Sequence, residues 1–373
     1  MKFLIKQDIL LENLNYVIKG VSSKNLIPIL NCIKFELTNE GLSLMSTDND
    51  IAIKTFISNN KIEKIEKLGS VVVSGKYIYE IIRKLPNELI NIEEVVDSKL
   101  YIYTENSSFH LNFNKIEEFP NLDLKESKNP IILNKTIFKN IINQTIFATS
   151  NQESRPVLTG INIKISDDIL ECTATDSYRL AKKIIKINTP VKEQINIIIP
   201  SKNINEINKM LFADENDIEI HIFNNKVIFK FDNIIVLSRL INGTYPDTSK
   251  LIPTEFKIRM CVNLEEFYNS IDRASLLTNE SEKNTIKLES NKNKITIFSN
   301  IPEIGKVEET LSIEKDVAED IKIAFSSKYM IEALRSLECE TIEILLNGEI
   351  NPIIIKNLND DSVIQLILPI RTY

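Results

Sequence analysis

Residues 74–86, SGKYIYEIIRKLP, form a stretch with two counterparts further along the chain. The counterparts are PSKNINEINKMLF at residues 200–212 and SSKYMIEALRSLE at residues 326–338. One lysine keeps its position in each copy, at intervals of 126 residues: Lys76, Lys202 and Lys328. A serine shortly before each lysine suits a helix N-cap, because its hydroxyl can accept from a free N–H of the first turn. Self-similarity at a long fixed period indicates a fold of repeated units.

A second amphipathic run also occurs three times. It begins near Asp8, and offsets of 128 and 257 residues lead to counterparts in NKTIFKNIINQTIFATS and NLEEFYNSIDRASLL. The matching positions are Leu10, Leu14, Val17 and Ile18, then Phe138, Ile142, Thr145 and Ile146, then Phe267, Ile271, Ala274 and Ser275. Spacings of i, i+4, i+7 and i+8 lie on one helix face. Each third of the chain is therefore expected to contain two helices.

Short alternating runs, such as NIEEVV, DIEIHIF and TIEILL, follow the helices and are separated by polar corners. This pattern predicts antiparallel sheets with the helices on one face. Polar, proline-bearing stretches near residues 126–130 and 253–255 have the composition of linkers. We therefore expect an α+β protein with three domains of one design, at residues 1–126, 127–253 and 254–373.

Residues 155–181, RPVLTGINIKISDDILECTATDSYRLA, end in a polar cluster where a buried strand would carry another apolar residue. Asp176 and Ser177 can make a turn there, because their side chains bond nearby backbone N–H groups. Alternatively, residues 178–180 are presented to a partner. The first unit has the same Thr-Asp pair at residues 47–48 but continues differently. We therefore assign the corner to the fold and its Tyr-Arg-Leu tail to function.

Composition bounds the class of protein. A chain of 373 residues is too long for one ordinary hydrophobic core, so more than one domain is expected. Its content of 43% hydrophobic and 26% charged residues is usual for a soluble globular protein. No apolar run approaches the roughly 20 residues of a membrane span, and the N-terminus does not resemble a signal peptide. The cysteines are far apart, which fits free thiols in a reducing cytoplasm and argues against disulfides or structural zinc: Cys32, Cys172, Cys261 and Cys339.

Motifs of catalysis are missing from the sequence. The eight glycines make no GxGxxG or GxxxxGK[ST], and neither HExxH nor GxSxG occurs. His110 and His221 lie in alternating runs and are expected to be sheet residues. A hydrolase using Asp176 and His221 would lack a third group at a recognisable spacing. The sequence therefore supports neither a nucleotide-phosphate loop nor a known catalytic motif, and we expect no metal or cofactor.

The charge pattern allows a nucleic-acid role. A net charge of −7 excludes a chain that is basic all over, but a local basic surface can coexist with an acidic remainder. The repeated lysines could be ordinary solvated residues. Alternatively, they could place positive charge along one side of an array of helices, an arrangement that a phosphate backbone would attract. Because the interleaving of basic and aromatic residues that is typical of single-strand binders is missing from these helices, duplex is the favoured ligand.

The chain resembles the bacterial sliding clamp family, the β subunits of DNA polymerase III, along nearly all of its length. The motifs that carry the resemblance occur in order: MKF at residue 1, PIL at 28, FPNLD at 119, ATD-x-x-RLA at 174, NGTYPDTSKLIP at 242 and LPIR at 368. The resemblance implies a non-catalytic processivity factor. It also implies a head-to-tail homodimer that closes six domains into a ring around duplex DNA, with sheets outside and two helices per domain inside.

Helix packing agrees with that implication. Twelve helices spaced roughly 8–10 Å apart give an inner circumference of about 100–120 Å and a hole on the order of 30–38 Å across. Duplex DNA with a layer of water fits such a hole. By similarity, the residues facing DNA would be Lys24, Gln152, Arg155 and Lys202. Aromatic residues often follow the position of Arg155 in the family, whereas here Pro156 and Val157 follow it.

The resemblance further implies a pocket for short peptides of partners, namely the replicative polymerase, the clamp loader and repair proteins. The implied pocket residues are Leu158, Thr175, Ser177, Tyr178, Arg179, Leu180, Pro246, Lys250, Leu251, Pro352, Leu368, Pro369, Ile370 and Arg371. Aliphatic walls would hold apolar anchors, and Arg179 and Arg371 would fix peptide carbonyls or a carboxylate. Ser177 stands where glycine is common, and Ile370 replaces a residue that is often more flexible.

A dimer interface between the first and third domains is implied in the same way. Its residues would be Lys76, Phe109, Leu111, Leu276, Leu277, Glu303, Glu308 and Glu309. Core burial of Leu276 and Leu277 is the alternative. A different functional class is also open: a scaffold of the same fold that binds peptides without encircling DNA.

Overall fold

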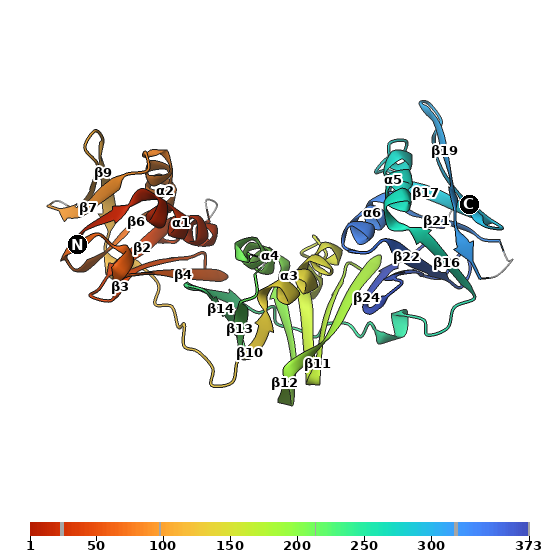
Figure 1. Cartoon of the computed structure of the whole chain (residues 1–373), viewed down its shortest axis with the longest axis horizontal. Coiled ribbons are helices and arrows are strands. Elements are labelled where there is room, and N and C mark those ends of the chain that lie inside the picture. Colours follow the sequence, from red (N-terminus) through yellow and green to blue (C-terminus); the bar gives the residue numbers. More distant parts are fainter. Residues whose placement is uncertain (23–25, 97, 213, 317–319, 372–373) are drawn as a thin grey trace. The chain divides into compact units, whose positions relative to one another are not determined.

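The computed structural model describes residues 1–22, 26–96, 98–212, 214–316 and 320–371. The chain forms two compact units, residues 1–136 with 203–240 and residues 137–202 with 241–373, each with its own sheets (Figure 1). The middle third of the sequence contributes to both units. Its β15 (Ile234–Arg239) pairs with β4 (Ile51–Ser58) in the first, and its β12 (Arg179–Pro200) pairs with β24 (Asp360–Ile367) in the second.

The six predicted helices are all found among the described residues. They are α1 Gln7–Val17, α2 Gly75–Lys84, α3 Lys135–Asn143, α4 Ser201–Met210, α5 Leu264–Ser275 and α6 Ser327–Arg335. The predicted apolar faces are buried, as Leu10 and Leu14 in α1 and Phe267 and Ile271 in α5 illustrate. Helix α1 packs beside α2, and α5 packs beside α6 (Figure 1). Within the described residues no helix is long and apolar enough to cross a membrane.

The expected capping bonds are not formed at α2 and α6. Ser74 and Ser326 occupy the N-cap positions of α2 and α6, but neither hydroxyl accepts from the first helical turn. Helix α5, for which no serine cap was predicted, is capped by an asparagine, since Asn263 Oδ1 accepts from the Glu266 N–H at 3.0 Å. The repeated serines therefore mark the helix starts without supplying the bond that was predicted from them.

The first unit contains one antiparallel sheet of thirteen strands, in the order β10-β13-β14-β15-β4-β3-β2-β6-β9-β8-β7-β1-β5. Strand β9 pairs with β8 along Ser108–Asn112 but meets β6 only at Phe113 and Asn114, so most of one edge is unpaired among the described residues. Besides β4 and β15, the strands are β1 Lys2–Lys6, β2 Cys32–Leu37, β3 Gly41–Thr47, β5 Lys64–Lys67, β6 Gly69–Ser74, β7 Leu89–Val95, β8 Lys99–Tyr103, β9 Ser108–Asn114, β10 Ile131–Asn134, β13 Asp217–Ile222 and β14 Lys226–Phe231.

The second unit contains two antiparallel sheets, in the orders β11-β12-β24-β23-β22-β16-β20 and β19-β18-β17-β21. One apolar core, which includes Phe267, Ile271, Met330 and Ile344, joins α5 and α6 to these sheets. The remaining strands are β11 Gly160–Thr175, β16 Ile258–Asn263, β17 Thr285–Asn291, β18 Lys294–Ile301, β19 Gly305–Ser312, β20 Glu314–Lys315, β21 Lys322–Ser326, β22 Thr341–Leu346 and β23 Ile353–Asn357.

Candidate partner-binding site

The polar corner between β11 and β12 is held by its own side chains. Thr175 Oγ1 donates to the Arg179 carbonyl at 2.6 Å. Asp176 Oδ1 accepts from the N–H groups of Tyr178 and Arg179 at 2.9 and 3.0 Å. Ser177 has a φ of +78°, in the left-handed region that favours glycine. The predicted turn is thus confirmed, and it leaves the Tyr178 side chain 54% exposed.

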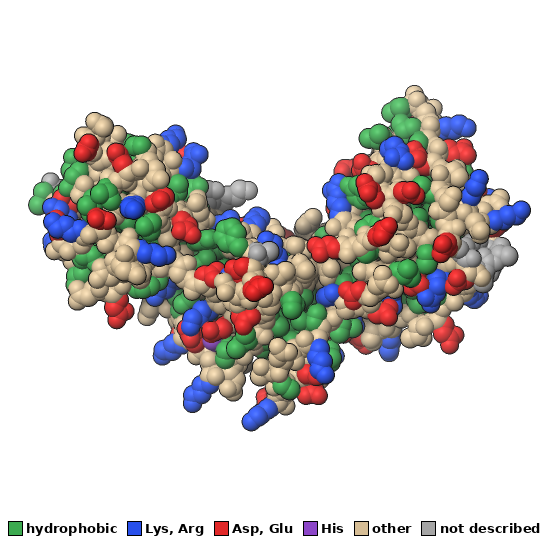
Figure 2. All heavy atoms as spheres, viewed as in Figure 1, with side chains coloured by type: hydrophobic (Ala, Val, Ile, Leu, Met, Phe, Trp, Pro, Cys, Tyr) green, Lys and Arg blue, Asp and Glu red, His purple; other side chains and the backbone are tan. Residues whose placement is uncertain are grey.

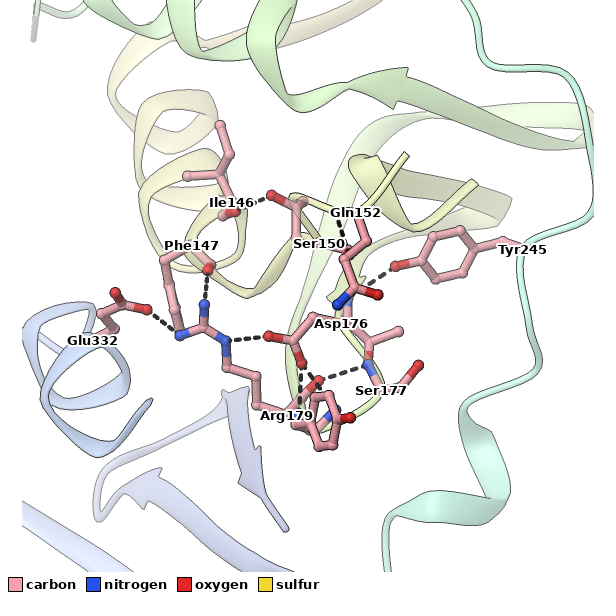
Figure 3. Close-up of polar contacts among 12 residues, drawn as sticks. Ile146, Phe147, Ser150, Gln152, Asp176, Ser177, Arg179, Tyr245 and Glu332 are labelled. Atoms are coloured by element: carbon pink, nitrogen blue, oxygen red, sulfur yellow. Dashed lines mark hydrogen bonds and ion pairs between the residues drawn. The ribbon is translucent and has the colours of Figure 1, made fainter. Parts of the chain in front are cut away.

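Arg179 is the most extensively bonded side chain of this corner and is only 8% exposed. Its Nε donates to Asp176 Oδ2 at 3.0 Å, one terminal nitrogen pairs with Glu332, and the other donates to the Phe147 carbonyl at 2.6 Å (Figure 3). The guanidinium also lies 4.5 Å from the centroid of the Tyr329 ring. These contacts brace the corner against α6 and against the turn after α3. A guanidinium carries five N–H donors and Arg179 also lines the adjacent hollow, so its role in binding a peptide stays a prediction.

A hollow of 400 Å³ opens beside this arginine. Its lining comes from the turn after α3, from the corner and from α6. The lining residues are Ile146, Phe147, Thr149, Ser150, Asn151, Gln152, Asp176, Tyr178, Arg179, Lys328, Tyr329 and Glu332. The surface is mainly polar, with aromatic side chains at Phe147, Tyr178 and Tyr329. Such a surface can hydrogen-bond a peptide backbone and pack against one or two of its side chains.

The C-terminal segment lies against the same corner. Strand β24 pairs with the start of β12, placing Leu366 opposite Leu180, and the Leu368 N–H donates to the Tyr178 carbonyl at 2.9 Å. Beyond it, the Ile370 N–H donates to the Ala324 carbonyl at 2.7 Å. The structure therefore brings together two parts of the implied pocket that are almost 190 residues apart in the chain.

The other implied pocket residues are distributed more widely. Leu158 is buried with Ile198 and Tyr245, and Leu180 is buried with Leu345, Ile354 and Leu366. Ile370 and Arg371 line a separate hollow of 440 Å³, beside Lys287, Glu289, Lys322 and Glu349. The more exposed members are Ser177, Pro246, Lys250, Leu251 and Leu368, and Pro352 and Pro369 are half-buried. Grouping of all fourteen residues in one pocket stays a prediction.

Phe147, Tyr329 and Glu332 were not identified from the sequence. A signal existed for the glutamate, because Glu80, Glu206 and Glu332 recur at intervals of 126 residues. In α2 and α4 the glutamate pairs with the base three residues later, Arg83 or Lys209, each at 2.7 Å. In α6 the corresponding base, Arg335, instead donates to the Tyr268 hydroxyl. Glu332 is then available to Arg179.

The four residues expected to face DNA lie in different parts of the fold. Lys24 lies outside the described residues. Lys202 is exposed at the second position of α4, as Lys76 and Lys328 are in α2 and α6. Gln152 lines the hollow beside Arg179, and Arg155 donates to Ser177 Oγ at 3.3 Å. The face in Figure 2 shows basic and acidic side chains interspersed.

The residues expected at a dimer interface lie on two separate surfaces. Phe109 and Leu111 lie on the partly unpaired strand β9, and Phe109 is 38% exposed. Leu276, after α5, is 78% exposed, so core burial does not apply to it, whereas Leu277 is half-buried. Lys76, Glu303 and Glu308 are exposed. Glu309 is half-buried, and the Arg273 guanidinium beside it holds the pKa of its carboxyl below the usual range.

The two histidines are sheet residues, as predicted. His110 lies on β9 and stacks on Tyr101 with ring centroids 4.4 Å apart, and His221 is buried on β13. The oxygens of Glu126 and Glu219 lie near His221 and could in principle hold a cation. The site is already occupied by Lys230, which pairs with Glu126 at 2.8 Å. His221 Nδ1 accepts from the Ser127 N–H at 3.0 Å, so this ring nitrogen is already bonded within the protein.

Three family models match the chain in sequence order. They are the N-terminal, central and C-terminal domains of the DNA polymerase III beta subunit, at residues 1–123, 132–247 and 249–371. The chain belongs to the DNA polymerase III beta subunit family. The beta sliding clamp of Bacillus subtilis (strain 168) is 40% identical over 378 residues, with 100% of both chains covered. That of Staphylococcus epidermidis is 38% identical over 377 residues, also with 100% coverage of both.

Solved structures of beta subunits have the same fold. The crystal structure of the DNA polymerase sliding clamp from Bacillus subtilis matches with a TM-score of 0.96 at 40% identity, and each chain is covered completely (100%). The beta chain of DNA polymerase III from Streptococcus pneumoniae TIGR4 matches with a TM-score of 0.95 at 32% identity, again over 100% of both chains. The predicted family, the three-domain clamp fold and the function of a processivity clamp are thereby confirmed.

Proposed function

We propose that this sliding clamp works as a homodimeric ring around duplex DNA. The observation that carries the proposal is membership of the sliding-clamp family over the full length of the chain. Two strand edges support closure: within the part of the chain that the structure describes, β9 is largely unpaired on one side, and β19 ends its sheet. Unpaired edges with exposed apolar residues such as Phe109 favour pairing with a second copy.

The contact with DNA would be weak and independent of base sequence. Lys76, Lys202 and Lys328 are exposed at one position of three repeated helices, so they can attract phosphates without reading bases. A closed ring holds DNA topologically and does not need tight contacts. The net charge of −7 would favour sliding by keeping the remaining surface from adhering to DNA.

Partner proteins would bind through short peptides at the surface formed by the corner at residues 175–180 and the C-terminal segment at residues 368–371. Exposed Tyr178 and Leu368 offer apolar contacts there, and the polar hollow beside Arg179 offers hydrogen bonds. The replicative polymerase, the clamp loader and repair proteins are the proposed partners. The protein is proposed to act in the cytoplasm. The role is proposed to be non-catalytic, without a cofactor.

Topology provides the decisive experiment for the ring. Clamp loaded on nicked circular duplex should stay bound through gel filtration and should dissociate after a restriction enzyme linearises the circle. Equal retention on circular and linear DNA would contradict encirclement. No retention on either, together with intact peptide binding, would favour the scaffold without a DNA role.

Deletion of residues 368–373 tests the peptide site. Loss of the Leu368 bond to the Tyr178 carbonyl and of the apolar wall should abolish partner-peptide binding. The dimer should remain, because β9, β19 and Leu276 are elsewhere in the sequence. Fluorescence anisotropy with a labelled partner peptide and light scattering measure the two properties. Unchanged peptide affinity would refute the assignment, and deletion of residues 372–373 alone serves as the matched control.

A further inference from the structure

The corner that organises the partner site has a counterpart in the first unit. Thr47 Oγ1 donates to the Ile51 carbonyl at 2.8 Å, as Thr175 Oγ1 does to Arg179. Asp48 Oδ1 accepts from the N–H groups of residues 50 and 51 at 3.0 and 2.9 Å. Asn49 has a φ of +80°, close to the +78° of Ser177. The two corners are therefore the same turn, built twice.

The strand beside each corner is also equivalent. Leu237 of β15 lies opposite Ala52, in the same way that Leu366 of β24 lies opposite Leu180. The Arg239 N–H donates to the Asp50 carbonyl at 2.9 Å, matching the bond from Leu368 to Tyr178. Arg239 is thus the positional equivalent of Leu368.

A hollow of 340 Å³ lies at this first-unit corner, and we call it the N-terminal hollow. It is lined by Thr47, Asn49, Ala52, Pro120, Asn121, Leu122, Asp123, Asn225, Lys226, Leu237 and Arg239. All of these residues belong to the first unit. The fold therefore supplies the framework of a peptide site a second time, with different side chains in it.

The side chains make the N-terminal hollow polar and cationic. Ala52 replaces Leu180, and Arg239 replaces Leu368, so two apolar contacts of the partner site are missing here. Lys226 is neutralised by Asp123, whose carboxylate it contacts at 2.7 Å. The exposed Arg239 guanidinium, in contrast, has neither a hydrogen bond nor an ion pair among the described residues. The hollow consequently carries one uncompensated positive charge, surrounded by the amides of Asn49, Asn121 and Asn225.

We propose that the N-terminal hollow binds a short acidic peptide segment of a partner protein, a second docking point that adds to the proposed peptide site and rests on that function. Arg239 would pair with a carboxylate through its planar fork of donors, and the asparagine amides would bond the peptide backbone. A nucleic-acid strand fits less well. Only one cation is uncompensated, and the Asp123 carboxylate stands in the wall.

Methyl-resolved NMR of the full-length protein tests this inference, with the methyl groups of Ala52 and Leu237 as reporters. The probes are the acetylated, amidated pentapeptides Ala-Asp-Ala-Asp-Ala and Ala-Lys-Ala-Lys-Ala. The acidic probe should shift both reporters saturably, with a dissociation constant on the order of 1 mM, and the basic probe should not. Arg239→Gln should weaken binding at least tenfold, Arg239→Lys should retain part of it, and Arg335→Gln, an arginine of the second unit, should leave it unchanged.

Several outcomes would overturn the inference. They are no saturable shift of Ala52 and Leu237, equal shifts with both probes, or unchanged affinity in Arg239→Gln. Tighter binding of an oligo-dT strand than of the acidic probe, at the same reporters, would assign the hollow to nucleic acid instead. The methyl groups of Leu366 and Leu368, titrated with Ala-Leu-Ala-Leu-Ala, report the proposed partner site separately, so failure of one site is distinguishable from failure of the other.

Discussion

Arg179 shows how one buried side chain can hold together the segments that form a surface. Its guanidinium joins the corner to the Phe147 carbonyl and to Glu332 of α6, and it is almost completely buried. Buried charges of this kind are stable only when their donors are satisfied. The surface beside Arg179 therefore depends on three chain segments that must be in place before any partner arrives.

Replacement of Arg179 by glutamine should lower the free energy of unfolding by about 2 kcal/mol, because Asp176 and Glu332 would lose their shared cation. The affinity for a partner peptide should fall as well, since Arg179, Asp176 and Glu332 also line the hollow. Chemical denaturation and anisotropy measure the two effects. Arg155→Gln is the matched control, because Arg155 is exposed and its side chain bonds only to Ser177 among the described residues. Equal stability of the two variants would contradict the bracing role.

At the scale of elements, ion pairs connect the start of α3 to two turns of the first unit. Lys135 is fully buried, at 0% exposure, and its Nζ lies 2.8 Å from Asp214 Oδ2 and 2.8 Å from Asp232 Oδ2. Burial opposes the charge of Lys135, but hydrogen bonds to Asp214 and Asp232 outweigh it and raise the pKa of the amine. The hydrogen bond from Lys135 likewise lowers the pKa of Asp214.

Lys135→Met should destabilise the protein by about 1 kcal/mol near pH 7, because two partly exposed carboxylates lose their cation. A carboxyl with a lowered folded-state pKa stabilises fully above its unfolded-state pKa, about 4, and ceases to do so as the pH falls through the folded value. The difference between wild type and variant should therefore shrink on acidification below pH about 4. Urea unfolding at several pH values measures it, with Lys67→Met at an exposed position as control. A constant difference across pH would contradict this origin.

At the scale of the whole molecule, two exposed apolar surfaces of the chain are those expected to meet a second copy. Leu276 is 78% exposed and Phe109 is 38% exposed, beside strand edges that lack partners among the described residues. Large exposed apolar side chains at unpaired edges are costly in a monomer at working concentration. Dimerisation would remove both from water at once.

Leu276→Lys should convert the dimer to a monomer at micromolar concentration, because it places a charge where apolar packing is expected. Light scattering after gel filtration measures the mass. Ile350→Lys provides the control, since Ile350 is also exposed, at 69%, but lies between β22 and β23, which belong to a different sheet from β19. A dimer that survives Leu276→Lys, or a monomer produced equally by both variants, would refute the interface.

Local periodicity and repetition were sufficient to predict part of the fold. Helix positions followed from a spacing of about 3.6 residues, strands from alternation, and the threefold design from the intervals of 126 to 129 residues. The Thr175-Asp176 corner could be predicted because its bonds run within five residues. Family motifs added the expected function, which the comparisons confirmed.

Tertiary structure alone decided which distant side chains meet. Glu80, Glu206 and Glu332 are equivalent in sequence. Glu80 and Glu206 pair with Arg83 and Lys209 of their own helices, whereas Glu332 pairs with Arg179, 153 residues earlier. The surroundings of Arg239 could not be predicted from the sequence, because they depend on the pairing of β15 with β4 beside the first corner. The physical reason is that burial and charge pairing depend on packing between strands far apart in the chain. A repeat in sequence can therefore predict two identical turns, whereas the chemistry beside each turn depends on what packs against it.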